Sequence, residues 1–500
     1  LKMLVTSRAP LRVSGEQVHA VTPLSLAGGP ESIDQSEATL FFVDRATATV
    51  PSFRLTAGNR EIVGEICRRL DGLPLAIELA VARLVLFSPA ELLARMDARL
   101  ALLRDGATDQ PDRLRSLHAS IAWSYDLLNV DEQALFMRLA VFMGGWTLEA
   151  AEAVAAGSER DTSVQGGLTT LISRNLVWSE VQPDGTSRYG LLETIREFAE
   201  ERLVAHGEDA AARDRHASWV LELARRTRTG NHQFEQILAI GPLEPEHSNI
   251  EAALHWLAAT GQAERLADLV IALEHHWEWN EYGVQGLGWC MRALEGRELS
   301  QSVRLEVLGG AAHLAEKLES PLAERLVEEY AAKAEECGTL RQRADAALLA
   351  GMHAEDSGDF PRAEGLFLLA CTQADQAGEA WISAQCSYHL GVVALGQGAL
   401  DQAMATFDAA QAAATTIGDP LIPAWCLVYQ ALICCEQGNP ERAAALLRNH
   451  PDMDQVGYRQ HQPLLRAVAS VVACRFDDYR RGARLLGSAI HDVPMRSPEK

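Results

Sequence analysis

A short pattern that returns at a fixed interval is the strongest constraint on the fold of the C-terminal half. A small residue recurs with a constant step of 40 residues, at Ala323, Ala363, Ala403, Ala443 and Ala483. A glycine stands five residues before three of these alanines, at Gly358, Gly398 and Gly438. Glycine ends helices readily, and alanine lets a neighbouring helix approach closely. The pattern therefore predicts stacked helix pairs, an α-solenoid, over residues 211–500.

Composition favours a helical, water-exposed protein. Aromatic residues make up 6% of the chain, and the formal net charge is -23. No run of apolar residues is long enough for a membrane helix, and no signal peptide is visible. Nine cysteines without a C-x-x-C pair fit free thiols in a reducing compartment. We therefore expect a cytoplasmic protein with no membrane partner, and the Arg- and Ala-rich composition suggests a bacterial source.

The N-terminal residues have the pattern of the last strands of a parallel α/β sheet. Residues 2–8 form an apolar run that ends in Thr6-Ser7-Arg8, and a second run covers Gln17–Leu26. Two strands do not make an α/β domain alone. Residues 1–35 are therefore interpreted as part of such a domain, and we expect the chain to be a fragment or a truncated product.

Helical patterns follow over residues 36–110. Ser36 and Asn59 are candidate caps, and Asp71-Gly72 ends the second helix. Pro74 then stands at the first turn of an apolar helix, where proline is tolerated. Ser88-Pro89-Ala90-Glu91 is a further start signal, which we expect to open a helix that continues to about Leu103.

Residues 111–210 change from helices to a hairpin. Helices are predicted at Leu117–Leu128, Asp131–Phe142, Thr147–Ala156 and Gly167–Asn175. Two apolar runs, Leu176–Val181 and Ser187–Leu192, flank a turn containing Pro183 and Gly185. A last helix is expected over Glu193–His206. Helices followed by a hairpin wing predict a winged-helix domain.

Two short segments are candidates for a ligand site. Arg8 would lie at the carboxyl end of a parallel strand, where open α/β sheets bind ligands and a guanidinium can pair with phosphate. The second is Gly72-Leu73-Pro74-Leu75. The alternative interpretation of Arg8 is a surface turn residue, and that of Gly72–Leu75 is a simple corner between helices.

Together, these motifs resemble the NB-ARC-type signal-transduction ATPases (STAND class), in particular the large bacterial LuxR-type regulators. Leu4-Val-Thr-Ser-Arg8 is similar to their sensor motif, and Gly72-Leu-Pro-Leu75 to their GLPL motif. The resemblance implies that Arg8 faces the γ-phosphate and Pro74 packs near the adenine, with Gly72 needed for its backbone. It extends over the winged helix to about residue 225, and beyond that it is the architecture of a TPR-like sensor. The 40-residue step is longer than the ~34 residues of a TPR.

The chain departs from that family in its nucleotide motifs. No lysine stands in a G-x-x-x-x-G-K-[S/T] loop, and no Walker B acid is found. Leu191-Leu192-Glu193 stands where the family has Met-His-Asp, and leucine donates no hydrogen bond. The family binds ADP or ATP and hydrolyses ATP slowly. We expect this chain alone to bind neither nucleotide and to be no enzyme, with no catalytic residues.

Charge and residue spacing argue against nucleic acid and metal ions as ligands. Residues 117–205 carry thirteen acids and six arginines, and Arg174 is the one base on the expected recognition helix. DNA affinity needs several phosphate contacts, so no direct nucleic-acid binding is expected. His275, His276 and Glu281 suggest metal, but neighbouring helical positions diverge, so packing of Trp277 in the first repeat is preferred and no metal site is predicted.

Three hypotheses for function follow. The first is the sensor and switch half of a transcriptional regulator, with a protein partner or small inducer on the solenoid and signal-dependent oligomerisation. The second is a TPR scaffold for protein–protein interaction without a nucleotide role. The third is an ATPase whose phosphate-binding loop comes from a separate chain.

Overall fold

The computed structural model describes residues 21–27, 30–94, 96, 117–155, 163–228, 241–279, 282–296, 299–449, 462–476, 480, 482, 484 and 485. The chain forms two compact units. The first contains Leu1–Val220 and Pro245–Trp256, and the second contains Leu221–Glu244 and Leu257–Lys500. The division predicted at residues 35, 110 and 210 stays a prediction. Arg8 and Ala483 lie outside the described residues.

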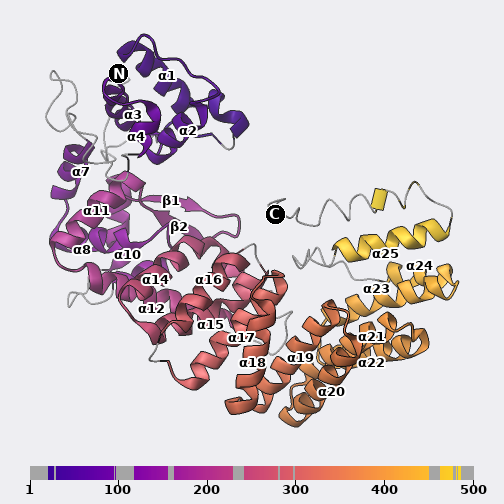
Figure 1. Cartoon of the computed structure of the whole chain (residues 1–500). Helices are drawn as coiled ribbons and strands as arrows, with labels where there is room; N and C mark the ends of the chain where they lie inside the picture. The colour runs from indigo at the N-terminus through magenta and orange to yellow at the C-terminus, as the bar shows by residue number, and fades with distance from the viewer. Residues whose placement is uncertain are drawn as a thin grey trace. The chain divides into compact units, whose positions relative to one another are not determined.

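The first unit begins with a small group of helices (Figure 1): η1 Pro30–Gln35, α1 Glu37–Thr49, α2 Arg60–Arg69, α3 Pro74–Ala82, η2 Arg83–Val85 and α4 Pro89–Ala94. The predicted cap of α1 is confirmed, because Ser36 accepts a hydrogen bond from the Thr39 amide. Ser88 and Glu91 cap α4 reciprocally, each accepting from the other's backbone N–H. Asn59 precedes α2 as expected, but its side chain binds the loop at Thr56 and Arg54 instead of capping the helix.

The strand expected over Gln17–Leu26 is wrong in its described part, since residues 21–27 belong to no strand or helix. The backbone of this segment is bonded to helix ends instead of to a sheet. Leu24 N–H donates to the carbonyl of Gly72 at 3.0 Å, and the carbonyl of Ser25 accepts from Ala38 N at 3.2 Å. These bonds satisfy backbone groups that a strand would have offered to a neighbour.

A winged helix follows in the same unit, as predicted. Its elements are α7 Leu117–Asp126, α8 Val130–Arg138, η4 Leu139–Val141, α9 Leu148–Ala155, α10 Val164–Ser173, β1 Trp178–Val181, β2 Ser187–Gly190 and α11 Glu193–Ala205. The two strands pair antiparallel, with Trp178 opposite Gly190. The predicted turn is confirmed, with Gly185 at a φ of 84°. Phe136 and Phe198 are fully buried between the helices.

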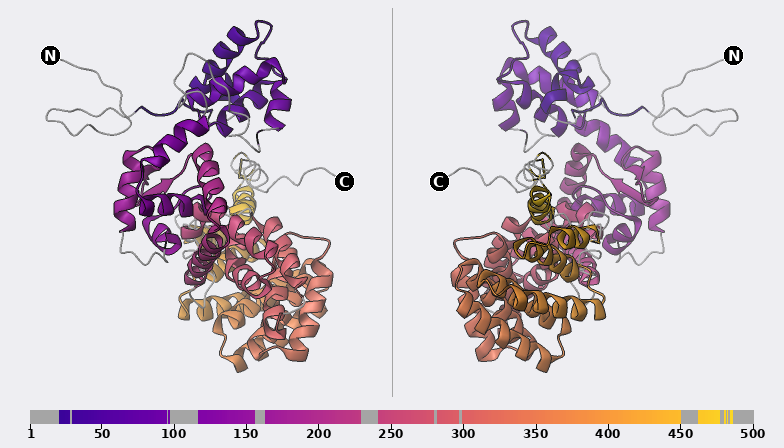
Figure 2. Two further views of the ribbon diagram at one scale, coloured as in Figure 1. Left: turned by 90° about the vertical axis from the view of Figure 1, so that its left-hand side faces the viewer. Right: turned by 90° about the vertical axis from the view of Figure 1, so that its right-hand side faces the viewer.

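Long helices make up the rest of the chain: α12 Asp209–Thr227, η5 Gly241–Glu246, α14 His247–Ala259, α15 Ala263–Trp279, α16 Gly283–Leu294, α17 Gln301–Lys317, α18 Ala323–Cys337, α19 Leu340–Asp356, α20 Phe360–Ala377, α21 Ala380–Gly396, α22 Leu400–Thr416, α23 Leu421–Glu436, α24 Pro440–Arg448 and α25 Gln462–Arg475. Within the second unit, helices from α17 to α24 lie side by side in successive pairs (Figures 1 and 2). The predicted TPR-like helical repeat is present.

The repeated small residues have the roles that their spacing predicted. Ala363, Ala403 and Ala443 are completely buried near the starts of α20, α22 and α24. The turn glycines before these helices, Gly358, Gly398 and Gly438, have φ values of 77°, 77° and 75°. This left-handed conformation is cheap for glycine alone. Each helix pair is therefore closed by a glycine and packed through an alanine.

Trp277 on α15 is completely buried, which confirms the packing interpretation of the His275–Tyr282 segment. Throughout the described part of the chain, no three His, Cys, Asp or Glu side chains are arranged to hold a metal. Nor does any helix in that part have the length and apolar character needed to cross a membrane.

Gly351 tests the close packing of a repeat. A Cβ at this position of α19 would lie 2.5 Å from Cε1 of the buried Phe367 ring on α20. We predict that Gly351→Ala destabilises the protein by about 1–3 kcal/mol, because the ring has no room to move. Gly365→Ala is the matched control, since nothing lies within 4 Å of its added Cβ, and it should stabilise α20 by about 0.5–1 kcal/mol. Urea denaturation followed by circular dichroism measures both, and equal effects would contradict the packing account.

Candidate functional site

The corner between α2 and α3 is fixed by Gly72. Its φ is +63°, and an added Cβ would lie 2.2 Å from the carbonyl oxygen of Leu24. The Leu24 N–H donates to the Gly72 carbonyl at 3.0 Å, and the Gly72 N–H donates to the Cys67 carbonyl at 3.1 Å. Only glycine combines this backbone conformation with so close an approach. The corner therefore holds the incoming segment of residues 21–27 by its backbone.

Pro74 sets the direction of the chain as it leaves the corner. It is the first residue of α3, where its missing N–H costs no helical hydrogen bond. Nearby, Ser25 N–H donates to Glu37 Oε2 at 3.0 Å at the start of α1. These bonds lower the pKa of the Glu37 carboxyl. The 21–27 segment is thus bound both to the α2–α3 corner and to the first turn of α1.

The same corner reaches the winged helix through Asp71. This residue has a φ of 54°, a left-handed conformation that aspartate adopts more readily than most residues other than glycine. Its Oδ2 accepts a long hydrogen bond of 3.4 Å from the Thr194 N–H, in the first turn of α11. A carboxylate at a helix N-terminus is stabilised by the helix dipole. α11 has no side-chain cap of its own from Leu192, so Asp71 supplies one from another element.

Of the three residues predicted for a nucleotide site, Gly72 and Pro74 lie together in this corner, and Arg8 lies outside the described residues. Which ligand they face stays a prediction. Sequence reasoning missed Leu24 and Asp71. Asp71 was visible only as the residue before a helix-ending glycine, a position that gave no sign of a partner 123 residues further along the chain.

A second constellation, also missed, lies at the base of the wing. Arg188 on β2 pairs with Glu246 through Nη1 and Oε1 at 2.7 Å. Its Nη2 donates to the Pro245 carbonyl at 2.7 Å and to the Gly145 carbonyl at 3.2 Å. The side chains of Arg188 and Glu246 are only 12% and 5% exposed. The guanidinium of Arg188 is therefore held by an ion pair and hydrogen bonds within the first unit.

Asn249 completes this buried polar cluster. Its Nδ2 donates to Glu246 Oε2 at 2.6 Å and to the Gly145 carbonyl at 2.9 Å, while its Oδ1 accepts from Met143 N at 2.7 Å. His216 Nε2 lies 3.3 Å from the same oxygen. An amide oxygen only accepts, so His216 carries its proton on Nε2. Burial lowers the pKa of His216 to about 4, so the ring is neutral at physiological pH.

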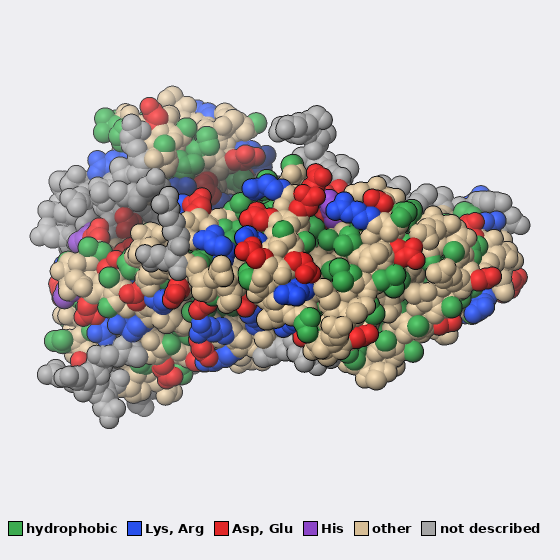
Figure 3. Space-filling view, turned by 60° about the horizontal axis from the view of Figure 1, so that its bottom comes forward, with side chains coloured by type: hydrophobic (Ala, Val, Ile, Leu, Met, Phe, Trp, Pro, Cys, Tyr) green, Lys and Arg blue, Asp and Glu red, His purple; other side chains and the backbone are tan. Residues whose placement is uncertain are grey.

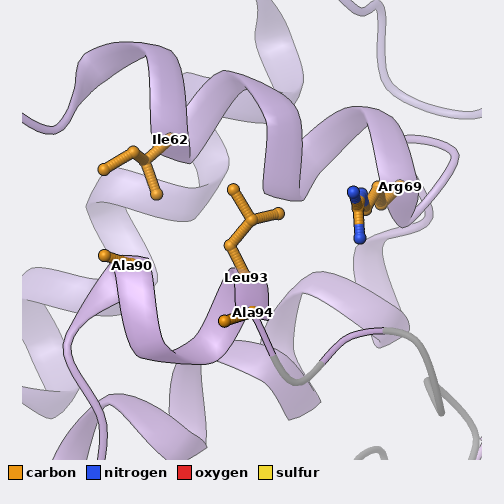
Figure 4. Close-up of a pocket in the computed structure, with 5 residues that line it drawn as sticks. All are labelled: Ile62, Arg69, Ala90, Leu93 and Ala94. Atoms are coloured by element: carbon orange, nitrogen blue, oxygen red, sulfur yellow. The ribbon is translucent and has the colours of Figure 1, made fainter.

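A shallow hollow of about 330 Å³ lies beside the corner, between α2 and α4 (Figure 4). Leu93 points from α4 towards Ile62 on α2, and Arg69 stands at one end of the hollow. Arg69 Nε is paired with Glu65 Oε1 at 3.1 Å. The other residues that line the hollow are Ala90 and Ala94. This chemistry offers an apolar floor and no nucleophile, acid or base.

Residues 128–204 match the family model of a winged helix-turn-helix domain. This segment is a winged helix-turn-helix. Proteins of Mycobacterium bovis and Mycobacterium tuberculosis that are named HTH-type transcriptional regulators are 38% identical over 320 residues, 63% of this chain and 35% of theirs. The chain thus spans about a third of their length. An uncharacterised Mycobacterium tuberculosis protein is 37% identical over 233 residues, 46% of this chain and 57% of its own.

Two solved structures resemble the chain at low similarity. One is a signal-transduction ATPase (STAND) protein with a tetratricopeptide repeat sensor from Pyrococcus horikoshii, with a TM-score of 0.33 and 13% identity, covering 91% of this chain and 72% of that one. The other is the apo form of RapI, with a TM-score of 0.41 and 13% identity, covering 52% of this chain and 95% of that one.

Replacement of Gly72 tests the corner. We predict that Gly72→Ala costs about 3 kcal/mol of stability, because it adds left-handed strain and an overlap with the Leu24 carbonyl. Gly207→Ala is the control: Gly207 has a φ of +72° with nothing within 4 Å of an added Cβ, so it should cost about 1 kcal/mol. Hydrogen exchange at the Leu24 amide should accelerate in Gly72→Ala only. Unchanged protection there would contradict the proposed contact.

The wing-base cluster predicts a pH dependence. His216 has a pKa of about 4 in the folded protein and about 6.5 in an unfolded chain. Between these two pH values, His216 is protonated in the unfolded state but not in the folded state. The contribution of His216 to the free energy of unfolding is therefore fully present above pH ~6.5, and the free energy falls by up to about 3 kcal/mol towards pH ~4. His216→Gln should flatten this slope by about one proton, whereas His255→Gln, at an exposed histidine, should not. Unfolding free energies measured across this range decide between the two.

Proposed function

We propose that this chain is the sensor and switch half of an NB-ARC-type, LuxR-like transcriptional regulator of the STAND class. The relatives named as HTH-type transcriptional regulators support a regulatory role. The sequence motifs at Arg8 and Gly72–Leu75 support the finer assignment. In this proposal, ADP or ATP bound against the corner, with the rest of its site supplied from outside this chain, would act on the corner, and the solenoid would receive the signal.

The observation that carries the proposal is the position of the Gly72 corner. One backbone segment holds residues 21–27 through Leu24, and the neighbouring side chain of Asp71 holds the start of α11. A shift of residues 21–27 would therefore be felt at the first turn of the winged helix. Two states of such an element, biased by two ligands, are what allosteric coupling requires.

The chain itself is proposed to be no enzyme. Cradling phosphates and holding Mg²⁺ need a glycine-rich loop with its lysine and an acid after a strand. Neither motif occurs in the 500 residues. Gly72 and Pro74 would then contribute one wall of a nucleotide site, with Arg8 pairing to phosphate, and ADP or ATP would bind only with the missing parts supplied. Supply by a separate chain remains the third hypothesis.

For the winged helix, we propose a lever and not a DNA reader. Its net charge is negative, and Arg188, the base on the wing, is paired inside the unit. On the face drawn in Figure 3, Lys and Arg side chains alternate with Asp and Glu and form no broad basic patch among the described residues. The family match to winged helix-turn-helix domains favours DNA binding as the alternative. Salt-sensitive binding of a labelled duplex at low ionic strength would support that alternative.

The solenoid is proposed as the surface for a protein partner or inducer, with oligomerisation as the output of switching. Stacked repeats present an extended concave surface that suits binding. The alternative is a TPR scaffold that binds a protein with no nucleotide role. The two differ in whether events at the Gly72 corner change what the solenoid binds.

The first test is calorimetric titration of the chain with ADP and with ATP. We expect no binding up to millimolar concentrations, because the groups that hold phosphates and Mg²⁺ are lacking in these residues. Arg8→Ala and Arg12→Ala are the paired variants, since both remove one positive charge from the N-terminal segment. Micromolar binding that is lost in Arg8→Ala and kept in Arg12→Ala would show a complete site and contradict the proposal that this chain alone binds no nucleotide.

A further inference from the structure

The odd-numbered helices form the inner row of the solenoid. Each of α17, α19, α21 and α23 packs on the next odd-numbered helix, in addition to its own partner. Successive even-numbered helices, α18, α20, α22 and α24, approach one another at most marginally among the described residues. The row with the closer spacing lies on the concave side of a curved stack, which is the side that repeat proteins use for binding.

Buried and half-buried polar side chains beside this row are bonded to groups on neighbouring helices. Both carboxylate oxygens of Asp345 on α19 lie within 3.2 Å of His313 Nε2 on α17, and the Tyr330 hydroxyl donates to Oδ2 at 2.8 Å. Gln430 on α23 is 2% exposed, and its Nε2 donates to Asp408 Oδ1 on α22 at 2.7 Å. Such bonds are expected, because a buried polar group without a partner destabilises the fold.

Gln385 on α21 has no such partner. The residue is only 5% exposed, yet its amide forms no hydrogen bond with any group in the described part of the chain. One turn earlier, Trp381 Nε1 donates to Asp419 Oδ2 at 3.0 Å, just before α23, and one turn later His389 Nδ1 lies 2.9 Å from Glu355 Oε2 on α19. Residues one turn apart share a side of a helix. Gln385 therefore lies on the side of α21 that faces the rest of the inner row.

The repeat explains why the Gln385 amide has no partner. Gln385 stands forty residues after Asp345, and Ala370 stands forty residues after Tyr330. Alanine has no hydroxyl, so the group that donates to Asp345 in one repeat is missing from the next. Ala370 is completely buried in the core that α19, α20 and α21 share. α21 thus carries a polar side chain at a position where the fold offers it no partner.

The unbonded amide reaches the solvent. A polar atom that is enclosed and has no partner is found elsewhere in the described part of the chain, at Trp277 Nε1. The oxygen and nitrogen of the Gln385 amide are not enclosed in this way. The small exposed part of Gln385 therefore includes its amide, and a molecule that lies along the inner row can reach it.

We propose that the Gln385 amide binds the main chain of an extended peptide segment of a partner protein. The inference rests on the proposed role of the solenoid as a partner surface and names the group that this surface binds. A carboxamide presents a donor and an acceptor side by side. The N–H and C=O of one residue in an extended chain also point to one side, so the two can exchange two hydrogen bonds.

The surroundings of the Gln385 amide favour a neutral main chain over an ionic ligand. The amide is uncharged, and the nearby charges of His389 and Glu355 are already paired with each other. Main-chain hydrogen bonds supply much of the affinity when a protein binds an extended peptide. An unbonded amide on the inner row fits that kind of contact, because it needs no change in any existing bond of the solenoid.

An amide that serves binding should add nothing to the stability of the free protein. Methionine has nearly the same length and no group that needs a partner, so Gln385→Met should leave the urea midpoint of the full chain unchanged or raise it. Gln430→Met is the matched control and should lower the midpoint, because this equally buried glutamine is bonded to Asp408. A fall of the same size in Gln385→Met would show that this amide has a structural partner and would overturn the proposal.

Nuclear magnetic resonance of the full chain, isotopically labelled at the glutamine side-chain nitrogens, tests binding directly. The Gln385 and Gln430 signals are the ones missing from the two methionine variants. The probe is acetyl-tetraalanine amide, and its twin carries N-methyl groups in place of the peptide N–H hydrogens at alternate residues. Tetraalanine should shift the Gln385 amide signals progressively, and the N-methyl twin should shift them several-fold less. The Gln430 signals should stay in place with both peptides.

Three results would contradict main-chain binding at Gln385. These are equal shifts of the two glutamine signals, equal shifts with the two peptides, and unchanged Gln385 signals at peptide concentrations on the order of tens of millimolar, where even weak complexes form. None of them decides whether the chain is the sensor half of a regulator, because the nucleotide titration tests that proposal with a different ligand and a different part of the chain.

Discussion

The packing of one aromatic ring against one small residue in each helix pair is the interaction on which the solenoid depends. Phe367 lies over Gly351, and forty residues later Phe407 lies over Gly391, where added Cβ atoms would come within 2.5 and 2.7 Å of the rings. The rings are also used from the other side: His389 stacks on Phe367 at 5.0 Å and Tyr429 on Phe407 at 5.6 Å. Each ring thus packs against both its own helix pair and the next one. These tightly packed contacts leave little freedom of movement between successive repeats.

The first unit is organised by buried polar contacts instead. The wing base is held by Arg188, Glu246 and Asn249, and the first turn of α11 is held by Asp71. Burying an ion pair adds little net stability, but removing one partner strands the other, at a cost of about 3–5 kcal/mol. Such contacts therefore do more to select one arrangement of the elements than to add to the stability of the fold. The wing of the winged helix and the first turn of its last helix are therefore both fixed by contacts to other elements of the first unit.

Features that depend on residues close together in the sequence could be predicted, and features that depend on distant residues could not. Gly358 and Ser88 act on residues a few positions away, and their roles in helix pairing and capping were predictable from spacing alone. The hairpin turn at Gly185 was predictable for the same reason. Gln17–Leu26 was predicted as a strand because it is a short apolar run bounded by loop signals, yet the backbone of Leu24 and Ser25 binds Gly72 and Ala38. Asn249, which joins three parts of the first unit, stands in an ordinary helical pattern. Two of its partners, Met143 and Gly145, lie about a hundred residues away in the sequence, a distance at which no spacing rule applies.

Electrostatics gives the solenoid a direction that its repeated shape does not. The 40-residue step places histidine at 313 and 353, but valine and isoleucine stand at 393 and 433, so the imidazoles that match inner carboxylates stop part-way along the stack. Beyond that point the inner helices carry tyrosine and tryptophan in place of ion pairs, with Tyr429 standing where His389 stood one repeat earlier. A neutral ring thus takes over the packing role of the imidazole, and Leu395 stands one repeat after its partner Glu355, so the carboxylate is replaced as well. The two kinds of repeat therefore differ in how successive helices are joined, by histidine–carboxylate pairs in the first and by aromatic packing in the second.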